Sequence, residues 1–258
     1  MRIGYRTPGL KEFSFAEKLK LAKDLGLDAV EFSLGEFQGE GDIEEVREKA
    51  AEMDIALSAM GGGVNLCNPD LLEKSFADCE RALEFCHKLG IKILFSRSLS
   101  PAEGVPQKET WKTCAQATRQ VAQMAANSGI KFAIESDPPC FVQNLERVER
   151  LLEMVDHPHL FVNFDPTNYY VVGSDPFKVI ERLGHLMING HIKDGIYRQE
   201  KKGEVAIGEG EVEYPEIFRV LMAKKIDIVM SIEHCKTAQE VTSAAAHIKK
   251  VLAQIAGD

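Results

Sequence analysis

The hydrophobic and polar positions along the chain follow two alternating patterns, one typical of amphipathic helices and one typical of buried strands. The first helix is predicted to begin at Ser14, which can form a capping box with Glu17. Apolar residues then recur at helical spacing until Gly26, a residue suited to end the helix. A short apolar run at 29–33 follows. The same order of helix, turn and apolar run continues along the chain.

This alternation predicts a closed α/β barrel. Strands separated by helices must be parallel, and a parallel sheet needs both faces covered. Eight strand–helix units predict a (β/α)8 TIM barrel, eight parallel strands with an outer ring of helices, as a single domain over 1–258. A doubly wound open sheet is the alternative, but no glycine fingerprint follows the first predicted strand. The predicted strands are 3–6, 29–33, 55–59, 92–96, 131–135, 160–165, 186–193 and 227–233, and the helices after the first lie near 42–53, 70–89, 109–128, 144–155, 176–183, 214–224 and 237–256.

Composition and charge narrow the class of protein. Forty acidic against 31 basic side chains give a net charge of −9, which disfavours approach to a nucleic-acid backbone. No apolar run approaches the roughly 18 residues that a membrane span requires. The six cysteines form no C-x-x-C pair, and the first residues lack the apolar core of a secretory signal. We therefore expect a cytoplasmic protein with reduced thiols and with neither nucleic-acid nor membrane partners.

Four consecutive predicted strands, the fifth to the eighth, end in side chains that could bind a metal. Active sites of TIM barrels lie at the carboxyl ends of the strands, so these four side chains should meet at one rim. Three carboxylates packed together would repel one another unless a cation neutralised them. Taken singly, each could instead be an ordinary rim residue. Three oxygen ligands and one imidazole suit Mn²⁺, Mg²⁺, Co²⁺ or Zn²⁺, and the four residues are Glu135, Asp165, His191 and Glu233.

Four segments surround these residues: AIE at 133–135, NFDPTN at 163–168, HIKD at 191–194 and SIEH at 231–234. Together they resemble the xylose isomerase-like barrel superfamily. More narrowly they resemble its sugar phosphate isomerase/epimerase branch, which includes ketose 3-epimerases, hydroxypyruvate isomerases, inosose dehydratases and dehydroshikimate dehydratases. The resemblance implies one divalent metal, Mn²⁺ first among the candidates, held by the four residues above. It also implies that Glu135 and Glu233 exchange protons with opposite faces of the carbon next to a carbonyl.

The resemblance implies a metal-dependent isomerase or epimerase that acts on a ketose or keto-sugar through a metal-stabilised enediolate. Two departures favour an alternative. Asn168 stands where the epimerases usually carry a histidine, and an amide cannot carry a proton at neutral pH. The arginine that epimerases have after the strand-seven histidine would have to be replaced by Lys193 or Arg198. Lys193 resembles the lysine of the dehydratases, so the alternative is a lyase that eliminates water or an alcohol from a keto-sugar, keto-glycoside or keto-cyclitol.

Other residues complete the predicted site. We expect Asn168, Lys193, Trp111 and Tyr169 to contact the substrate, the two aromatic side chains through the apolar faces of a sugar ring. His234 is expected to point away from its neighbour Glu233, with a supporting role beside the ligands as the alternative. No Lys and Arg cluster is evident in the sequence, which indicates a small, unphosphorylated sugar or cyclitol. The branch's frequent dimers and tetramers suggest a homodimer or homotetramer.

Two further functions are less consistent with the sequence. An endonuclease of the abasic-site type shares the superfamily barrel but needs three zinc ions and additional histidines. The second and third predicted strands end in Ser33 and near Met60, without a histidine. A non-catalytic sugar-binding barrel would be indicated by loss of one of the two glutamates, and both Glu135 and Glu233 are present.

Overall fold

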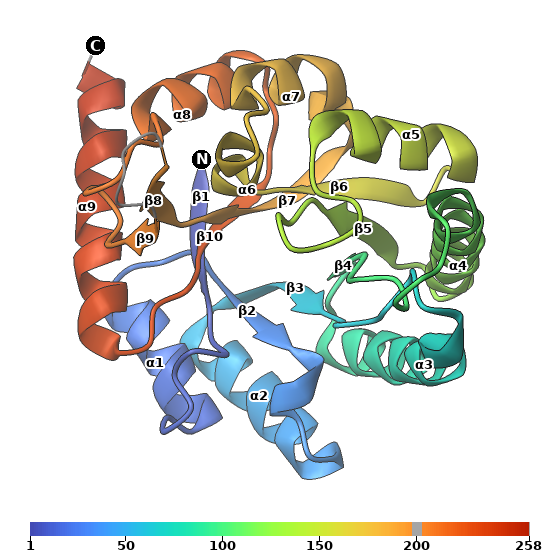
Figure 1. Cartoon of the computed structure of the whole chain (residues 1–258). Helices are drawn as coiled ribbons and strands as arrows, with labels where there is room; N and C mark the ends of the chain where they lie inside the picture. The colour runs from blue at the N-terminus through green and yellow to red at the C-terminus, as the bar shows by residue number, and fades with distance from the viewer. Residues whose placement is uncertain (198–202, 258) are drawn as a thin grey trace.

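A computed structural model describes residues 1–197 and 203–257. Within these residues, eight parallel strands close into a barrel, because β1 pairs with β2 on one side and with β10 on the other (Figure 1). The closed order confirms the predicted TIM barrel. The barrel strands are β1 (Arg2–Arg6), β2 (Ala29–Ser33), β3 (Ala56–Gly61), β4 (Ile93–Arg97), β5 (Lys131–Glu135), β6 (Leu160–Phe164), β7 (Met187–Ile192) and β10 (Val229–Ile232).

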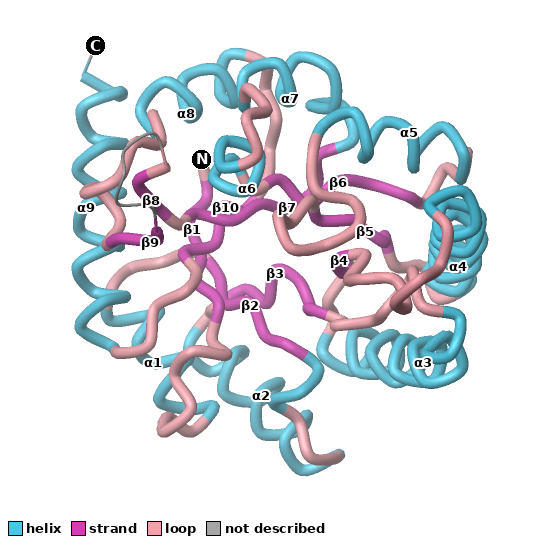
Figure 2. The backbone as a smooth tube through the Cα atoms, viewed as in Figure 1, coloured by secondary structure: helices cyan, strands magenta, loops and turns pink. Residues whose placement is uncertain are grey.

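Helices surround the barrel and connect successive strands (Figure 2). The predicted capping box is present: the Ser14 hydroxyl accepts from the Glu17 amide, and the Glu17 carboxylate accepts from the Ser14 amide at 2.8 Å. Gly26 takes the left-handed conformation (φ +55°) just beyond the helix end. The ring consists of α1 (Phe15–Asp24), α2 (Glu40–Met53), α3 (Leu72–Leu89), α4 (Gln107–Asn127), α5 (Leu145–Val155), α7 (Pro176–Leu183), α8 (Tyr214–Ala223) and α9 (Ala238–Gly257), with short 3-10 turns at Leu34–Glu36, Pro69–Leu71 and Gly184–Leu186.

The structure adds two elements that the sequence pattern does not predict, and both lie at the carboxyl ends of the strands. A short helix, α6 (Pro166–Val171), follows β6 directly, and Asp165 caps its first turn. A two-stranded antiparallel hairpin, β8 (Asp194–Ile196) and β9 (Gly203–Val205), follows β7. Both elements lack the apolar periodicity of a longer helix or strand. They add walls to the rim where the four candidate ligands meet.

The core fills the space between the barrel and its helices, with large side chains such as Phe32, Phe132 and Phe218 fully buried. The barrel interior is different near its carboxyl end, where it contains buried polar side chains, among them Glu31, Asn163 and Asn189. Burying such groups is unfavourable unless each finds a partner. Among the described residues, no helix is both long enough and apolar enough to cross a membrane.

Candidate metal centre

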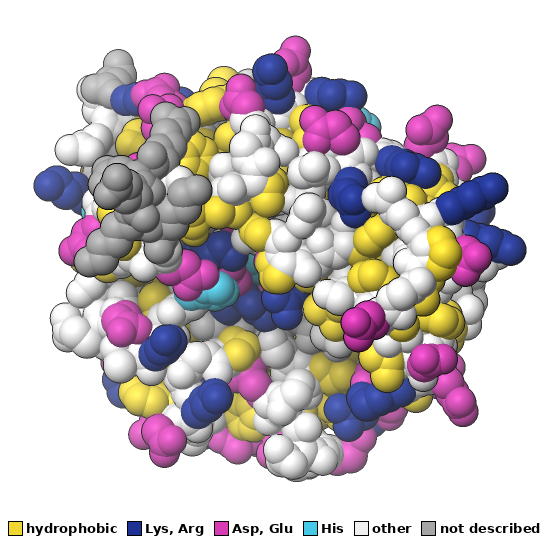
Figure 3. All heavy atoms as spheres, viewed as in Figure 1, with side chains coloured by type: hydrophobic (Ala, Val, Ile, Leu, Met, Phe, Trp, Pro, Cys, Tyr) yellow, Lys and Arg dark blue, Asp and Glu magenta, His cyan; other side chains and the backbone are white. Residues whose placement is uncertain are grey.

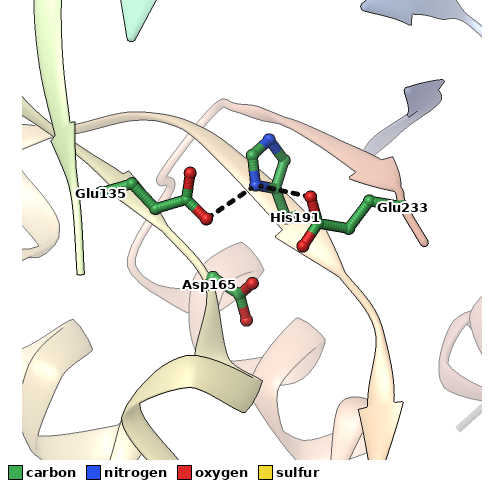
Figure 4. A group of neighbouring side chains, drawn as sticks. All are labelled: Glu135, Asp165, His191 and Glu233. Carbon is green, nitrogen blue, oxygen red and sulfur yellow. Dashed lines mark hydrogen bonds and ion pairs between the residues drawn. The ribbon is translucent and has the colours of Figure 1, made fainter. Parts of the chain in front are cut away.

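The four predicted ligands meet at the carboxyl end of the barrel. Glu135 ends β5, Asp165 follows β6, His191 lies near the end of β7 and Glu233 follows β10. All four are buried, and one ligand atom from each lies within 4.8 Å of the others. The four side chains converge from neighbouring strands onto one point (Figure 4). Such a group can hold one metal ion.

The imidazole of His191 lies between carboxylates. Its Nδ1 is 3.2 Å from Glu135 Oε1 and 3.4 Å from Glu233 Oε2 (Figure 4). Its Nε2 is 3.0 Å from Glu31 Oε1, on the other side of the ring. Burial lowers the pKa of His191, but the three surrounding carboxylates outweigh burial and raise it well above its ordinary value. The surrounding carboxylates therefore favour the protonated form of the ring in the metal-free protein.

The carboxylates respond to burial and to their neighbours in different ways. Burial raises the pKa of Glu233, yet His191, Lys193 and Arg6 lower it well below its usual value. The pKa of Glu135 is also lowered, since His191 outweighs the effect of burial. Burial dominates for Asp165, whose pKa is raised to about 6 although Lys193 acts against it. Both glutamates are thus held ionised, as a base or a metal ligand must be.

Lys193 lies inside the cluster. Its Nζ is 3.0 Å from Asp165 Oδ2 and 3.1 Å from Glu233 Oε1. Burial lowers the pKa of Lys193, but the adjacent carboxylates raise it above its ordinary value, so the ammonium is charged. The neighbouring carboxylate, Asp194, accepts backbone hydrogen bonds instead, including those of Gly208 and Gly210. Lys193 thus lies beside the candidate ligands, and its role toward a substrate stays a prediction.

Asn168 also reaches the cluster, whereas the two predicted aromatic contacts do not. Asn168 Nδ2 donates to Glu135 Oε1 at 3.3 Å. Trp111 is buried in α4 against Phe141 at a ring distance of 4.8 Å, and Tyr169 is fully buried beside Phe164. Both lie outside the cavity that the cluster faces, so their expected role in substrate contact is not supported. Helix packing buries both rings behind the rim.

Two residues of the site were missed from the sequence, Arg6 and Glu31. Arg6 ends β1, and its guanidinium is 2.6 Å from Glu31 and 3.1 Å from Glu233. Glu31 is fully buried in β2 and also accepts from Asn189 at 2.9 Å. A glutamate in the middle of the apolar run at 29–33 was the available signal, since a buried carboxylate requires a partner.

The formal charges of this buried group fit a divalent cation. With a neutral imidazole, four carboxylates face only two side-chain cations, which leaves an excess of two negative charges. One divalent cation would neutralise that excess, and a proton on the imidazole offsets half of it. Three carboxylate oxygens and one nitrogen are also a donor set that such ions accept. The group consists of Glu31, Glu135, Asp165, Glu233, Arg6, Lys193 and His191.

Arg6, Glu135, Lys193 and Glu233 of this group line a cavity of about 620 Å³. Lys, Arg and His side chains gather in the hollow on the face shown in Figure 3. Arg6, Arg97 and Lys193 all line this cavity, although they are far apart in the sequence, so the structure assembles cations that no local pattern indicated. Arg198, the other cation considered from sequence, lies outside the described residues. The remaining lining includes Gly61, Gly62, Gly63, Phe95, Glu135, Asp137, Pro138, Asn168, Tyr197, Glu233 and His234.

The expectation that His234 points away from the site was wrong. Its Nδ1 is 2.8 Å from Glu204 of β9, and its Nε2 is 3.6 Å from Glu233 Oε1. Residues that alternate along a strand face opposite sides, but His234 follows the strand in the left-handed conformation (φ +62°). This backbone turn brings its side chain back toward the cavity, which it lines.

Comparison with known proteins places this chain in a family. A family model described as "Xylose isomerase-like TIM barrel" matches residues 19–251. An inosose dehydratase of Clostridium perfringens is 22% identical over 184 residues, which cover 58% of this chain and 61% of that protein. The match thus spans about three fifths of the length of that relative.

Solved structures share the fold. A D-tagatose 3-epimerase-like protein superposes with a TM-score of 0.86 at 16% identity, covering 100% of this chain and 99% of its own. The IolI protein, in a crystal structure with zinc, superposes with a TM-score of 0.81 at 19% identity, covering 99% and 98%. The family model covers most of the chain, and the barrel is closed as in these structures. The chain therefore belongs to the xylose isomerase-like TIM barrel family.

Proposed function

We propose that the protein is a divalent-metal-dependent lyase that removes water from a keto-sugar or keto-cyclitol. The observation that carries this proposal is the ammonium of Lys193 within the ligand cluster, 3.0 Å from Asp165 and 3.1 Å from Glu233. A cation in that position can stabilise negative charge on a departing oxygen. The dehydratase name of the curated relative supports the same reading.

Glu135, Asp165, His191 and Glu233 would hold the metal, with Mn²⁺ as our first candidate and Mg²⁺, Co²⁺ or Zn²⁺ as others. When bound, the metal would polarise the substrate carbonyl and so make the neighbouring C–H more acidic. The zinc in the IolI structure supports a metal in a barrel of this family. The excess of negative charge in the buried cluster supports it independently.

The reaction needs a base and a group that assists departure of the hydroxyl. Glu135 or Glu233, both held ionised, removes the proton from the carbon next to the carbonyl. The electrons of that C–H bond form a double bond as the C–O bond of the neighbouring carbon breaks. Lys193 donates a hydrogen bond to the departing oxygen. The removed proton and the lost hydroxyl together make one water, so the reaction consumes no other reactant.

Asn168 and the cavity walls would hold the substrate in this orientation. The Asn168 amide donates to Oε1 of Glu135, which fixes that oxygen, and the hydrogen bond does not involve the other carboxylate oxygen. Asn168 and Lys193 line the cavity beside both glutamates, so each is placed to contact a bound sugar. The substrate is accordingly a small molecule that fits a cavity of about 620 Å³.

A second candidate is an isomerase or epimerase of a ketose or keto-sugar. The observation that favours it is the position of Glu135 and Glu233 on either side of His191, at 3.2 and 3.4 Å from the same nitrogen. Two ionised carboxylates that flank one carbon can remove a proton from one face and return it to the other. Asn168 argues against it, because an amide cannot take part in proton transfer.

One experiment separates the two reactions. The purified protein is loaded with Mn²⁺ and incubated in D₂O with ketoses, 3-keto-glucosides and keto-cyclitols, and products are followed by NMR and mass spectrometry. A product that lacks one water supports the lyase. Deuterium on a carbon next to the carbonyl, without loss of water, supports the isomerase or epimerase. Absence of both, with metal bound, contradicts both proposals for the substrates tested.

A further inference from the structure

We propose that Arg97 and Asp137 form a hydroxyl-recognition pair in the cavity wall and select an uncharged, polyhydroxylated ketone as the substrate. The inference rests on the proposed function for its reaction. It concerns the binding of the substrate, however, and its main test measures binding without turnover.

The pair lies next to the candidate metal centre. Arg97 ends β4 and is the register partner of Glu135 in β5, so the two strand ends are adjacent. Asp137 comes two residues after Glu135. Arg97 and Asp137 both line the cavity that Glu135 and Lys193 also line. A substrate whose carbonyl lies at the cluster therefore has this pair within the same cavity.

The pair is held in place yet open to the cavity. Arg97 Nη1 is 2.5 Å from Asp137 Oδ2, and the Arg97 side chain is 48% exposed. Asp137 begins a turn closed by the Cys140 amide, which donates to the Asp137 carbonyl at 2.9 Å. Two prolines, Pro138 and Pro139, occupy that turn and restrict its backbone. The carboxylate is thus presented by a rigid loop and not by a flexible surface segment.

Each cation among the described lining residues already faces a carboxylate. Arg6 is 2.6 Å from Glu31, and Lys193 is 3.0 Å from Asp165. Arg97 is likewise paired with Asp137. A phosphate or carboxylate on the substrate would have to approach Arg97 against the charge of Asp137. Anionic groups are therefore disfavoured at this wall of the cavity.

A sugar hydroxyl, in contrast to an anionic group, can bind favourably to both members of the pair. It donates one hydrogen bond and accepts others, so it can bridge a carboxylate and a guanidinium without separating them. Two neighbouring hydroxyls can accept from the guanidinium and donate to the carboxylate at once. The pair thus recognises hydroxyls on the part of the substrate that is distant from the carbonyl.

The test is the change in binding preference when Asp137 is neutralised. Sorbitol and sorbitol 6-phosphate, which share a carbon chain and differ in charge, are titrated by calorimetry into metal-free protein and then into Mn²⁺-loaded protein. Asp137→Asn is expected to tighten sorbitol 6-phosphate by about tenfold, since it frees the guanidinium for a charge-assisted contact, and to weaken sorbitol. Asp78→Asn is the matched control, because it removes one carboxylate that pairs with a lysine on the outer surface of α3.

Adding Arg97→Gln to Asp137→Asn is expected to abolish the gain in phosphate binding, which assigns the gain to Arg97. Circular dichroism checks that each variant is folded. If Asp137→Asn does not fold, Arg97→Gln alone decides, with weaker sorbitol binding expected. An unchanged preference in Asp137→Asn, an equal change in Asp78→Asn, or unchanged sorbitol binding in Arg97→Gln would each overturn the proposal.

These outcomes are separate from those that test the lyase. A shifted binding preference without dehydration of any keto-sugar would support the role of the Arg97–Asp137 pair and contradict the proposed function. Dehydration of a phosphorylated ketose with a higher kcat/KM than that of its neutral counterpart would support the proposed function and contradict the role of the pair.

Discussion

His191 Nε2 lies 3.0 Å from Glu31 Oε1, and neither side chain is exposed to solvent. The contact uses the ring nitrogen that faces away from Glu135 and Glu233. A carboxylate that accepts from Nε2 fixes the ring's orientation and leaves Nδ1 directed at the other ligands. Glu31, itself held by Arg6 and Asn189, is therefore a positioning residue for the candidate metal centre.

Glu31→Gln should weaken metal binding without removing a ligand. Loss of such a supporting carboxylate typically costs about 10- to 100-fold in metal affinity. Calorimetric titration with Mn²⁺ and Zn²⁺ measures the effect directly. Glu36→Gln is the control, because Glu36 pairs with Lys18 just beyond the same strand and does not contact His191. Equal metal affinities for Glu31→Gln and the wild type would refute this role.

Metal binding should stabilise the folded protein. A metal at 100 times its Kd adds about 2.7 kcal/mol to the free energy of unfolding, which corresponds to a rise in Tm of about 5–10 °C for a chain of this size. Thermal unfolding with EDTA and with added Mn²⁺ measures the shift. Asp165→Asn, which alters one ligand, should lose most of it. A shift of the same size in that variant would exclude Asp165 as a ligand.

Glu233→Gln should abolish turnover while the protein remains folded. The variant removes a carboxylate that is both a candidate base and a candidate ligand, and loss of a positioned base typically costs about 10²- to 10⁴-fold in rate. Proton exchange in D₂O and circular dichroism give the two readouts. Near-normal activity would contradict the two-carboxylate mechanism.

Lys193→Gln should separate the two steps of the proposed elimination. Without the ammonium, departure of the hydroxyl slows, whereas proton removal by a glutamate continues. The rate of dehydration should therefore fall more than the rate of deuterium exchange. Product mass and deuterium content on the same samples report both steps. Lys18→Gln is a matched control, since Lys18 is also buried and paired with a glutamate but lies outside the cavity. Equal losses of exchange and dehydration in Lys193→Gln would argue against this role.

Stability should fall at alkaline pH because of the buried thiols. Burial raises the pKa of Cys79, Cys86 and Cys235 to about 12, and burial with Asp137 raises that of Cys140 to about 11. The pKa of a thiol in the unfolded chain is about 8.5. The folded state favours the neutral thiols, so their contribution is complete below about pH 8.5 and is lost as the pH rises toward 11–12. Urea unfolding at pH 8 and pH 10.5 measures the decrease. Cys79→Ala should reduce the slope between these two pH values.

Much of the fold and of the ligand set follows from local sequence pattern. The periodicity of apolar residues predicts the helices and strands, and the strict alternation of helix and strand along the chain makes the sheet parallel. The carboxyl ends of parallel barrel strands meet at one rim, so a residue's position in its strand suffices to bring Glu135, Asp165, His191 and Glu233 together. No knowledge of side-chain packing is needed for that step.

Tertiary structure alone decided which side chains support and surround these ligands. Glu31 and His191 are 160 positions apart and meet only because the barrel interior brings β2 and β7 together. Trp111 and Tyr169 are at the rim in sequence but are buried by helix packing, and His234 is turned inward by a left-handed backbone. Contacts across a closed barrel and the direction of a side chain beyond a strand end depend on three-dimensional packing, which no local periodicity encodes.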